Sequence, residues 1–403
     1  MPRGTRRPDQ HPSQRRSGRA GGRRNAAPGA RAHHPAAVST GHRFAIACGG
    51  TGGHLFPGLA VAEVLRDRGH EVLLLVSEKE VDAVALREHP GFAAERLPGI
   101  GLPPLWSPRM LVFARQFLRA VGRCRALFAG WRPSAVLGMG GFTSTAPVWA
   151  ARRAGVPAFL HESNAIPGRA NRINARIAGR VLLGFAECRR HFPRAICEVT
   201  GTPVRRSLGL VLPRDEARKA LGLEPEGRVL LVMGGSQGAR GINELMAAAA
   251  VPFAAAGVQV IHLTGSQEER RVGEAYRAAG VRARVLAFHH RMEEAYSAAD
   301  VVVSRSGASS LAELAAFGLP ALLIPFPFAA EDHQTLNAEI FARAGAAEVI
   351  RERDASARTA ADRVIALLSD AARLGEMSRR SRGLAPGDAA ARVAEQLEKA
   401  VVS

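Results

Sequence analysis

The fold is decided by the stretch Phe44-Ala-Ile-Ala-Cys-Gly-Gly-Thr-Gly-Gly-His-Leu-Phe-Pro-Gly58. Its first five residues form an uninterrupted apolar run, which is typical of a strand buried on both faces of a parallel sheet. Four glycines surround Thr51, and an amphipathic segment runs from Pro57 to Arg68 and stops at Gly69. Proline is favoured in the first turn of a helix, so we expect a strand, a glycine loop and then a helix over residues 57–68.

The same alternation continues outward from this stretch. In the first half, buried strands are expected at residues 71–76, 135–137, 157–160 and 180–183, and helices at residues 110–128 and 170–177. The pattern restarts in the second half with a strand at 228–233, a glycine turn and a helix from Asn243, followed by strands at 258–263, 283–286, 300–303 and 320–324. Alternation of this kind predicts an α/β fold with two doubly wound parallel-sheet domains.

A short polar segment, Gly201–Arg206, carries a turn signal and marks the boundary between the halves. We predict a disordered basic extension over residues 1–42, a first domain over 43–204, a second over 205–385 and a C-terminal helical segment over 386–403. In open α/β sheets, ligands bind beyond the carboxyl ends of the strands. The glycine loops of two facing domains would therefore border one cleft.

Composition narrows the class of protein. The 403 residues are 47% hydrophobic and 23% charged, which suits a soluble globular protein of two or three domains. The four cysteines form no CxxC pair, so we expect neither a disulfide scaffold nor a structural zinc site and assign the chain to a reducing compartment. The longest uncharged stretch, residues 245–267, is broken by proline and glycine, so no bilayer span is predicted.

The first 43 residues hold ten arginines and one acid, Asp9, and so carry +9 of the formal net charge of +19. Met1 and Val38 are the only large apolar residues before His42, which is too little apolar surface for folding. The charge suits nucleic acid or anionic lipid, and a solubilising tail or a misassigned start explains it equally well. If DNA binding were the main role, removal of residues 1–42 would abolish a steeply salt-dependent association.

The first glycine loop is a candidate anion site. Thr51, Gly52 and Gly53 precede a helix, and the N–H groups at a helix start favour an anion. His54 stands at the mouth of this loop and is a candidate general base; a tight strand-to-helix turn is the alternative explanation of the glycines. A dinucleotide oxidoreductase is disfavoured, because the GxGxxG spacing is missing and Val76-Ser77 stands where a ribose-binding acid would end the second strand.

The second half offers two more loops. The turn at residues 234–238 presents Ser236 in the position equivalent to the first loop. After the strand ending at Ser304, small residues lead into a helix that is capped by Gly318, and this helix start is a candidate seat for a diphosphate.

Two charged residues near that seat have alternative explanations. Glu313 lies one turn into the helix and can accept hydrogen bonds from a ribose diol, but Ser310 and Glu313 also have the spacing of a capping box. Arg205 can supply charge to a diphosphate or be an ordinary exposed arginine.

Further polar loops are expected at the same cleft. The glycine turn at residues 138–142 and His161-Glu-Ser-Asn164 both follow strands of the first domain. Gln334 and Asn337 share one face of a helix and can read sugar hydroxyls. A buried His–Glu pair with a capping asparagine, and solvent-facing polar residues, are the respective alternatives.

The segment from Gly101 to Phe113 combines Leu102, Leu105 and Trp106 with a following run of arginines. An apolar face with a basic rim suits attachment to an anionic membrane surface. A core helix with a solvated arginine face is the alternative, which the proline-interrupted Leu-Trp segment disfavours. No DxD, HExxH or Walker motif is present, so the charge of a departing diphosphate must be met by helix N-termini, serines and arginine.

Seven strings in order resemble the MurG family of UDP-N-acetylglucosamine transferases: GGTGGHLFPG, GMGGF, HESN followed by AIPG, GTPVR, GGSQGAR, SRSGASSLAE and DHQTLNA. The resemblance covers about residues 43–400. It implies a GT-B fold, in which two Rossmann-like domains face each other across a cleft and the C-terminal helix crosses back to the first domain. It also implies inverting, metal-independent transfer of N-acetylglucosamine to undecaprenyl-diphosphate-linked muramyl-pentapeptide, converting lipid I to lipid II. A related glycolipid synthase acting on diacylglycerol is the alternative.

The resemblance further implies a peripheral, metal-independent protein at the cytoplasmic face of the cell inner membrane. We expect no cofactor, and nucleic acid is a disfavoured partner. It assigns cleft-lining roles to Thr51, Gly52 and Gly53, contact with the donor sugar to Asn164 and Gln334, and catalysis to His54. It assigns diphosphate contacts to Arg205 and Ser236, a backbone contact with uracil to His289, and binding of phosphate and ribose to Ala308, Ser309, Ser310 and Glu313.

Four positions depart from the family pattern. Ser163 replaces glutamine, Thr202 replaces asparagine, residues 142–147 replace a YVSGP-like stretch, and His289-His-Arg291 replaces an aliphatic-acidic tripeptide. The first and third bear on the acceptor side of the site, and the last bears on the uracil contacts.

Overall fold

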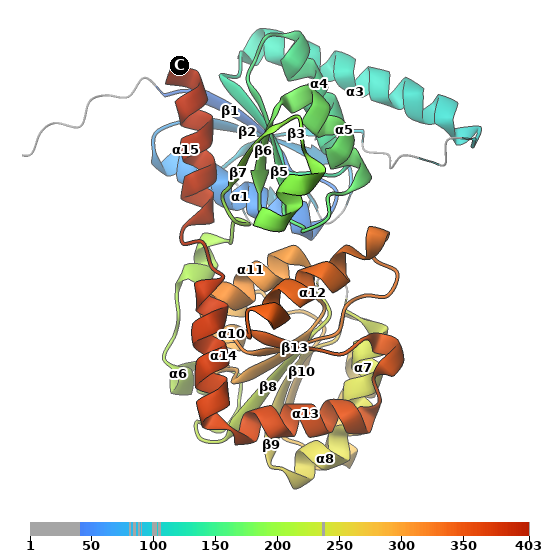
Figure 1. Ribbon diagram of the computed structural model, residues 1–403, viewed down its shortest axis with the longest axis vertical. Coiled ribbons are helices and arrows are strands. Elements are labelled where there is room, and N and C mark those ends of the chain that lie inside the picture. Colours follow the sequence, from blue (N-terminus) through green and yellow to red (C-terminus); the bar gives the residue numbers. More distant parts are fainter. Residues whose placement is uncertain are drawn as a thin grey trace, which may run out of the picture. The chain divides into compact units, whose positions relative to one another are not determined.

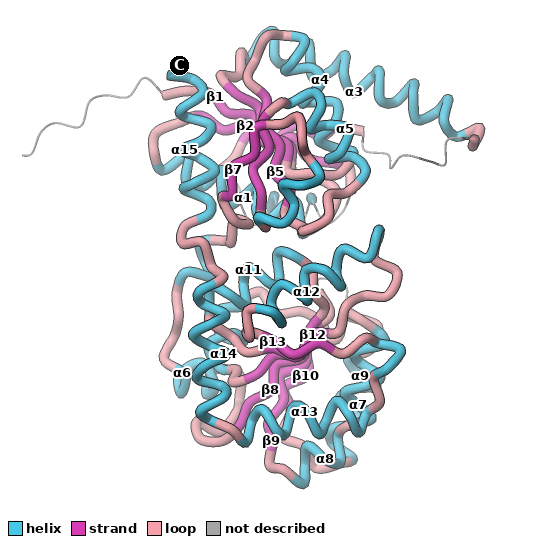
Figure 2. The backbone as a smooth tube through the Cα atoms, in the orientation of Figure 1, coloured by secondary structure: helices cyan, strands magenta, loops and turns pink. Residues whose placement is uncertain are grey.

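Two parallel sheets organise the computed structural model, which describes residues 41–79, 82–83, 86–87, 89, 91–98, 103, 106–235 and 238–402 (Figures 1 and 2). The expected basic extension at 1–42 therefore lies outside the described residues, apart from Gly41 and His42. Gly41–Ser403 belong to one compact unit.

The first sheet has seven parallel strands in the order β3-β2-β1-β4-β5-β6-β7. They are β1 (Arg43–Ala47), β2 (Glu71–Ser77), β3 (Ala93–Leu97), β4 (Ala135–Gly138), β5 (Ala158–Glu162), β6 (Arg180–Leu183) and β7 (Ile196–Val199). The two edge strands, β3 and β7, were not among the expected strands. Both are largely exposed or half-buried and so lack the apolar run that marks a central strand.

Helices cover both faces of this sheet. Phe44 and Ile46 of β1 pack in one core with α1 (Gly52–Asp67) and α15 (Ala389–Val402). Ala45 and Ala47 point the other way, into a second core with α3 (Arg109–Trp131) and α4 (Thr145–Arg153). Burial on both faces explains why β1 is apolar from Phe44 to Ala47, and α5 (Arg169–Ala178) also belongs to this half.

The second sheet has six parallel strands in the order β10-β9-β8-β11-β12-β13. They are β8 (Arg228–Met233), β9 (Val258–Leu263), β10 (Ala283–Leu286), β11 (Val301–Ser304), β12 (Ala321–Leu323) and β13 (Ala347–Val349). Around them lie α6 (Arg214–Ala220), α7 (Arg240–Ala248), α8 (Ala250–Ala255), α9 (Glu269–Ala278), α10 (Met292–Ala298), α11 (Ala308–Phe317), α12 (His333–Arg343), α13 (Ala357–Ser369) and α14 (Ala371–Gly383). The chain is thus an α/β protein with two doubly wound parallel sheets, as the alternation of apolar runs predicts.

The chain passes between the two halves twice, after β7 and between α14 and α15 (Figure 1). The two passages touch at Gly201, where an added Cβ would lie 2.0 Å from Cγ of Pro386. Gly201 also has a φ of +82°, a conformation that glycine adopts without strain. The strand order reverses between β1 and β4 and between β8 and β11, and these are the points where ligands bind in open α/β sheets.

Candidate functional site

A cavity of about 830 Å³ collects the loops at these reversal points from both halves. Twelve candidate residues identified from the sequence line it: Thr51, Gly52, Gly53, His54, Asn164, Arg205, His289, Ala308, Ser309, Ser310, Glu313 and Gln334. The remaining candidate, Ser236, lies outside the described residues. Residues more than 280 positions apart in sequence thus share one concave site.

The first glycine loop leads into α1 earlier than the position of Pro57 indicates. We expected the helix to begin at Pro57, but it begins at Gly52, and Pro57 lies inside it. Proline has no N–H to donate to the carbonyl four residues earlier, which is that of Gly53. The freed carbonyl oxygen accepts a hydrogen bond from Ser309 Oγ of the other half at 3.2 Å. Pro57 therefore leaves the carbonyl oxygen of Gly53 free at the cleft, where Ser309 of the opposite loop donates a hydrogen bond to it.

His54 stands on the first turn of α1 and faces the cavity. Its Nδ1 is buried and makes no hydrogen bond with the described residues. Burial lowers the pKa of His54, whereas the backbone at Met139 and the charge of Asp82 act in the opposite direction. The imidazole is consequently neutral near pH 7, the form that a general base requires.

The second binding element is the start of α11. Gly307 is its N-cap and makes no side-chain cap hydrogen bond, so the N–H groups of Ala308, Ser309 and Ser310 open toward the cavity. The capping-box explanation of Glu313 is wrong, because Gly307 rather than Ser310 begins the helix. Gly318 ends the helix in a left-handed conformation, as expected.

Glu313 is held by Tyr296, which was not identified from the sequence, and by Arg205, which was. Tyr296 of α10 donates its hydroxyl proton to Oε2 of Glu313 at 2.6 Å, and Nη2 of Arg205 lies 3.8 Å from Oε1. Burial raises the pKa of Glu313, while Arg205 and Tyr296 lower it. The carboxylate is thus partly desolvated and oriented at the cavity wall.

Arg205 lies where the chain passes from one half to the other. Its guanidinium stacks over the ring of Phe56 from α1, with 4.4 Å between Cζ and the ring centroid. Its Nε is buried without a hydrogen-bond partner among the described residues. An arginine that faces both halves and retains an unused N–H is placed to bind an anion between them.

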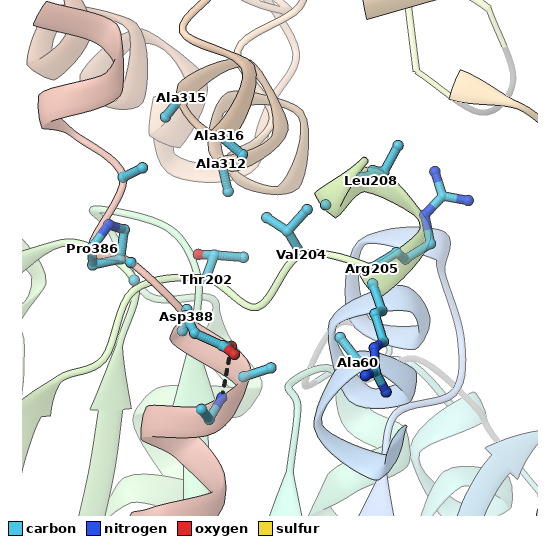
Figure 3. A pocket seen from close by; sticks show the side chains of 18 of the residues that line it. Ala60, Thr202, Val204, Arg205, Leu208, Ala312, Ala315, Ala316, Pro386 and Asp388 are labelled. Carbon is cyan, nitrogen blue, oxygen red and sulfur yellow. Dashed lines mark hydrogen bonds between the residues drawn. The ribbon is translucent and has the colours of Figure 1, made fainter. Parts of the chain in front are cut away.

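A second cavity, of about 460 Å³, adjoins this arginine on the side of the chain passages. Figure 3 shows Ala312, Ala315 and Ala316 of α11 along one wall and Pro386 and Asp388 along another. Arg205 and Ala308 line both cavities. These two residues therefore separate the larger cavity from the region where the halves are joined.

Glu162 at the end of β5 organises the loop that carries Asn164. Its Oε1 accepts hydrogen bonds from the backbone N–H and the side-chain amide of Asn164 at 2.9 and 3.1 Å. Its Oε2 accepts from Gly168 N and from Asn171 Nδ2. Burial raises the pKa of Glu162, and these four donors act against that shift. The carboxylate thus shapes the loop from behind and leaves Asn164 at the cavity.

His161 and Ser163 connect the same loop to the chain passage. Nε2 of His161 donates to the carbonyl oxygen of Gly201 at 2.9 Å, so Nδ1 is the acceptor that Ser163 Oγ meets at 3.3 Å. Burial lowers the pKa of His161 to about 4, so the ring is neutral. Ser163, the departure from the family glutamine, therefore has a partner within the loop.

Asn337 and Gln334 of α12 have different roles, the first structural and the second at the cavity. The amide of Asn337 is fully buried and bridges the halves: Oδ1 accepts from Ala165 N at 3.0 Å, and Nδ2 donates to Asn164 Oδ1 at 3.1 Å. Oε1 of Gln334 accepts from the backbone N–H of Ser306 and Phe326. Its Nε2 has no hydrogen bond with the described residues, so Gln334 rather than Asn337 presents a free donor to the cavity.

His289 lies at the end of the cavity formed by the second half. Its Nε2 is 3.1 Å from Oε2 of Glu294, so the side chain turns toward α10. Ala287 and Phe288 line the cavity beside it. The backbone of this segment is therefore available to a ligand although the imidazole is engaged.

The amphipathic segment after residue 100 is exposed on its apolar side. The exposed fractions of Trp106 and Leu111 are 98% and 79%, and Leu118 is exposed as well. The fully buried residues of α3 begin at Ala120 and continue with Val121, Cys124 and Phe128, while Phe117 packs against the same core partly exposed. The core-helix explanation therefore fails for the first half of α3. Leu102 and Leu105 lie outside the described residues.

Two features are absent from the part of the chain that the structure describes. No helix there is long and apolar enough to cross a membrane. In that same part, no three histidine, cysteine, aspartate or glutamate side chains are grouped closely enough to hold a metal ion.

Comparison with known proteins gives consistent matches over both halves. Residues 44–183 match the glycosyltransferase family 28 N-terminal domain, and residues 229–397 match the glycosyltransferase family 28 C-terminal domain. Two relatives share one name, UDP-N-acetylglucosamine–N-acetylmuramyl-(pentapeptide) pyrophosphoryl-undecaprenol N-acetylglucosamine transferase. The one from Geobacter sp. strain M21 is 36% identical over 86% of this chain and 93% of its own length. The one from Nitratidesulfovibrio vulgaris strain Miyazaki F is 39% identical over 88% of this chain and 96% of its own length.

A solved structure gives the same result for the fold. The crystal structure of MurG from Acinetobacter baumannii superposes with a TM-score of 0.71 at 28% identity and covers 89% of this chain and 99% of that one. The calicheamicin glycosyltransferase CalG4 superposes with a TM-score of 0.64 at 16% identity, which indicates the fold alone. The two doubly wound domains thus have the GT-B arrangement.

Proposed function

The chain belongs to the MurG family within glycosyltransferase family 28, and from that premise we propose that it transfers N-acetylglucosamine from UDP-N-acetylglucosamine to the muramyl 4-hydroxyl of undecaprenyl-diphosphate-linked muramyl-pentapeptide. The product is lipid II, formed from lipid I with inversion at the anomeric carbon. The observation that carries this proposal is the single cavity in which His54 of one half faces the open start of α11 and the Glu313–Arg205 pair of the other.

The chemistry follows from what each wall of the cavity supplies. His54, neutral near pH 7, takes the proton of the acceptor hydroxyl as its oxygen attacks the anomeric carbon from the face opposite UDP. Negative charge develops on the departing diphosphate, where the N–H groups of Ala308 and Ser309 and the guanidinium of Arg205 meet it. Glu313 accepts hydrogen bonds from the ribose diol. The reaction thus separates proton removal on one half from charge stabilisation on the other.

The remaining donor contacts are assigned by position. Asn164 and Gln334 contact the sugar, the backbone at His289 contacts uracil, and Ser236 contacts the diphosphate. Thr51, Gly52 and Gly53 line the acceptor side. Residues 43–204 are accordingly the acceptor and membrane domain, 205–385 the UDP-sugar domain, and 386–403 the segment that returns to the first.

The transfer is proposed to need no metal ion, because a helix start and an arginine supply the positive charge that a cation would otherwise bring. Activity in excess EDTA should therefore equal activity without it. Abolition by EDTA and restoration by Mg²⁺ would refute this part of the proposal.

We place the protein at the cytoplasmic face of the cell inner membrane as a peripheral protein. The support is the exposed apolar surface around Trp106 and Leu111 together with Arg109, Arg115 and Arg119 on the same exposed half of α3. Apolar side chains with a basic rim bind an anionic lipid surface. The acceptor, a lipid, is then presented at the surface where the first domain is attached.

The deciding experiment supplies purified full-length protein with UDP-N-acetylglucosamine and a polyprenyl-diphosphate muramyl-pentapeptide, and detects the disaccharide product by mass spectrometry. A parallel reaction replaces the acceptor with diacylglycerol, and His54→Gln serves as the inactive control. Product with diacylglycerol but none with the muramyl acceptor would replace the proposal by a glycolipid synthase.

A further inference from the structure

Both backbone polar groups of Gly50, in the first glycine loop, are held by side chains from the segment that follows β2. Its N–H donates to Asp82 at 2.9 Å from Oδ2, and its carbonyl oxygen accepts from Nζ of Lys79 at 2.9 Å. Neither residue lines the cavity, and neither belongs to a motif that the sequence singled out. A carboxylate and an ammonium thus clamp the two peptide units on either side of the Gly50 Cα, directly before Thr51.

Asp82 is built into the structure rather than placed at its surface. Its side chain is fully buried, and Oδ2 also accepts hydrogen bonds from Ser77 N at 2.8 Å and Ser77 Oγ at 2.5 Å. A buried carboxylate is costly unless its lone pairs are used, and here they are used on the glycine loop and the end of β2. The carboxylate therefore ties the loop to the sheet.

The loop has little room to adopt another path. A Cβ on Gly49 would lie 2.2 Å from Ser77 N and 2.7 Å from Asp82 Oδ2, and Gly50 has a φ of +113°. Only glycine fits both the close approach and the left-handed conformation. Because α1 begins two residues later, the clamp also determines where the helix start and His54 lie.

We propose that Lys79 and Asp82 are positioning residues for the transfer reaction, which hold the loop Gly49–Gly53 and His54 in the geometry that the acceptor needs. This inference rests on the proposed function. Neither side chain touches the reacting atoms in this scheme, since both act through the backbone of Gly50.

The two clamp residues also act on His54 through their charges, in opposite directions. Asp82 raises the pKa of His54, and Lys79 lowers it, in addition to the larger lowering caused by burial. Burial lowers the pKa of the neighbouring His161 from β5 to about 4, and His54 in turn lowers it as well, so this neighbouring ring is neutral near pH 7. Neutralising one clamp residue should therefore move the titration of His54 one way, and neutralising the other should move it the opposite way.

The test uses full-length Asp82→Asn and Lys79→Met, with Glu78→Gln as a matched control because Glu78 is an exposed charge in the same segment. We expect kcat for the muramyl acceptor to fall about tenfold or more in each clamp variant, because small displacements of a catalytic group are costly. The KM for UDP-N-acetylglucosamine, which binds the other half, should change less than twofold.

The pH dependence separates positioning from general damage to the fold. The acidic limb of kcat/KM reports the base in the free enzyme, so it should move to lower pH in Asp82→Asn and to higher pH in Lys79→Met. The pKa of His54, followed by NMR of histidine-labelled full-length protein and assigned with His54→Gln, should move in the same two directions. Unchanged kcat in both variants, or shifts of one sign, would overturn the inference.

Two possible results would leave the role of the clamp testable: loss of stability in Asp82→Asn, and failure of the proposed function. If Asp82→Asn lowers the melting temperature strongly, Lys79→Met, which changes an exposed side chain, still decides the question. If the wild-type protein makes no lipid II, the proposed function fails, while the NMR titration of His54 still shows whether the clamp acts on it.

Discussion

Replacing Tyr296 by phenylalanine removes the hydroxyl that orients Glu313. The bond from Tyr296 to Oε2 of Glu313 is 2.6 Å long, and Nη2 of Arg205 lies 3.8 Å from the other carboxylate oxygen. Tyr296 is fully buried, and its ring packs against Phe317. The phenylalanine ring fits the same space, so the change tests the hydroxyl rather than the packing.

The size of the effect follows from the role of that bond. Without it, Glu313 must be ordered when the ribose binds, which costs about 0.5–1.5 kcal/mol for one side chain, or roughly a 2- to 12-fold weaker affinity for UDP. Glu313→Gln removes the charged acceptor itself, and a hydrogen bond to a charged group contributes about 1.5–3 kcal/mol, or roughly 10- to 150-fold. Because Tyr296 acts through Glu313, the double variant should bind no more weakly than Glu313→Gln alone.

Isothermal titration with UDP and with 2′-deoxy-UDP measures both the affinity and the discrimination between the two ligands. Tyr276→Phe is the matched control, since this second buried tyrosine of the same half is bonded to His262 and does not line the cavity. We expect Tyr296→Phe to weaken UDP more than 2′-deoxy-UDP. Wild-type affinity in Tyr296→Phe, or additive losses in the double variant, would refute the assigned role of the pair.

Three further predictions concern stability and membrane binding. Burial lowers the pKa of His262 to about 3, against 6.5 when unfolded. As the pH falls below 6.5, His262 of the unfolded chain binds a proton that the folded chain does not bind, so the free energy of unfolding decreases. Between pH 7 and pH 5 this decrease should be ~2 kcal/mol smaller in His262→Gln than in the wild type, as measured by urea unfolding. Arg218→Met should lower the free energy of unfolding by about 1.5–3 kcal/mol, because it removes the buried guanidinium that donates to the half-buried carboxylate of Asp300 at 2.7 Å. Arg214→Gln removes an exposed partner of the same carboxylate and should cost under ~1 kcal/mol. Trp106→Ser with Leu111→Ser should reduce sedimentation with phosphatidylglycerol vesicles at least tenfold; unchanged sedimentation would place the membrane contact elsewhere.

Much of the site could be predicted from the order of residues along the chain. Glycine loops directly after apolar strands must come to the carboxyl edge of a parallel sheet, whatever the details of packing. His54, Asn164 and Glu313 lie on such loops or on the helix starts after them, and they meet at one cavity for that reason.

The edge strands and the first helix show where local patterns fail. β3 and β7 carry polar residues because an edge strand is partly solvated, so no apolar run marks them. α1 begins five residues before its proline, since the carbonyl that Pro57 leaves free is satisfied by Ser309 from the other half. A local rule cannot include a donor that is 256 positions away in sequence.

The sequence by itself determined the two parallel sheets, the loops that face the cavity and the family of the chain. Buried strands and ligand-binding loops can be recognised from short runs of neighbouring residues. Only the tertiary structure decided which side chains hydrogen-bond to the residues of those loops: Tyr296 to Glu313, Asn337 to Asn164, and Lys79 with Asp82 to Gly50. The physical reason is that hydrogen bonds and charges act through a few ångströms of space. Distance in space, unlike periodicity along a strand or helix, is set only when the whole chain has packed.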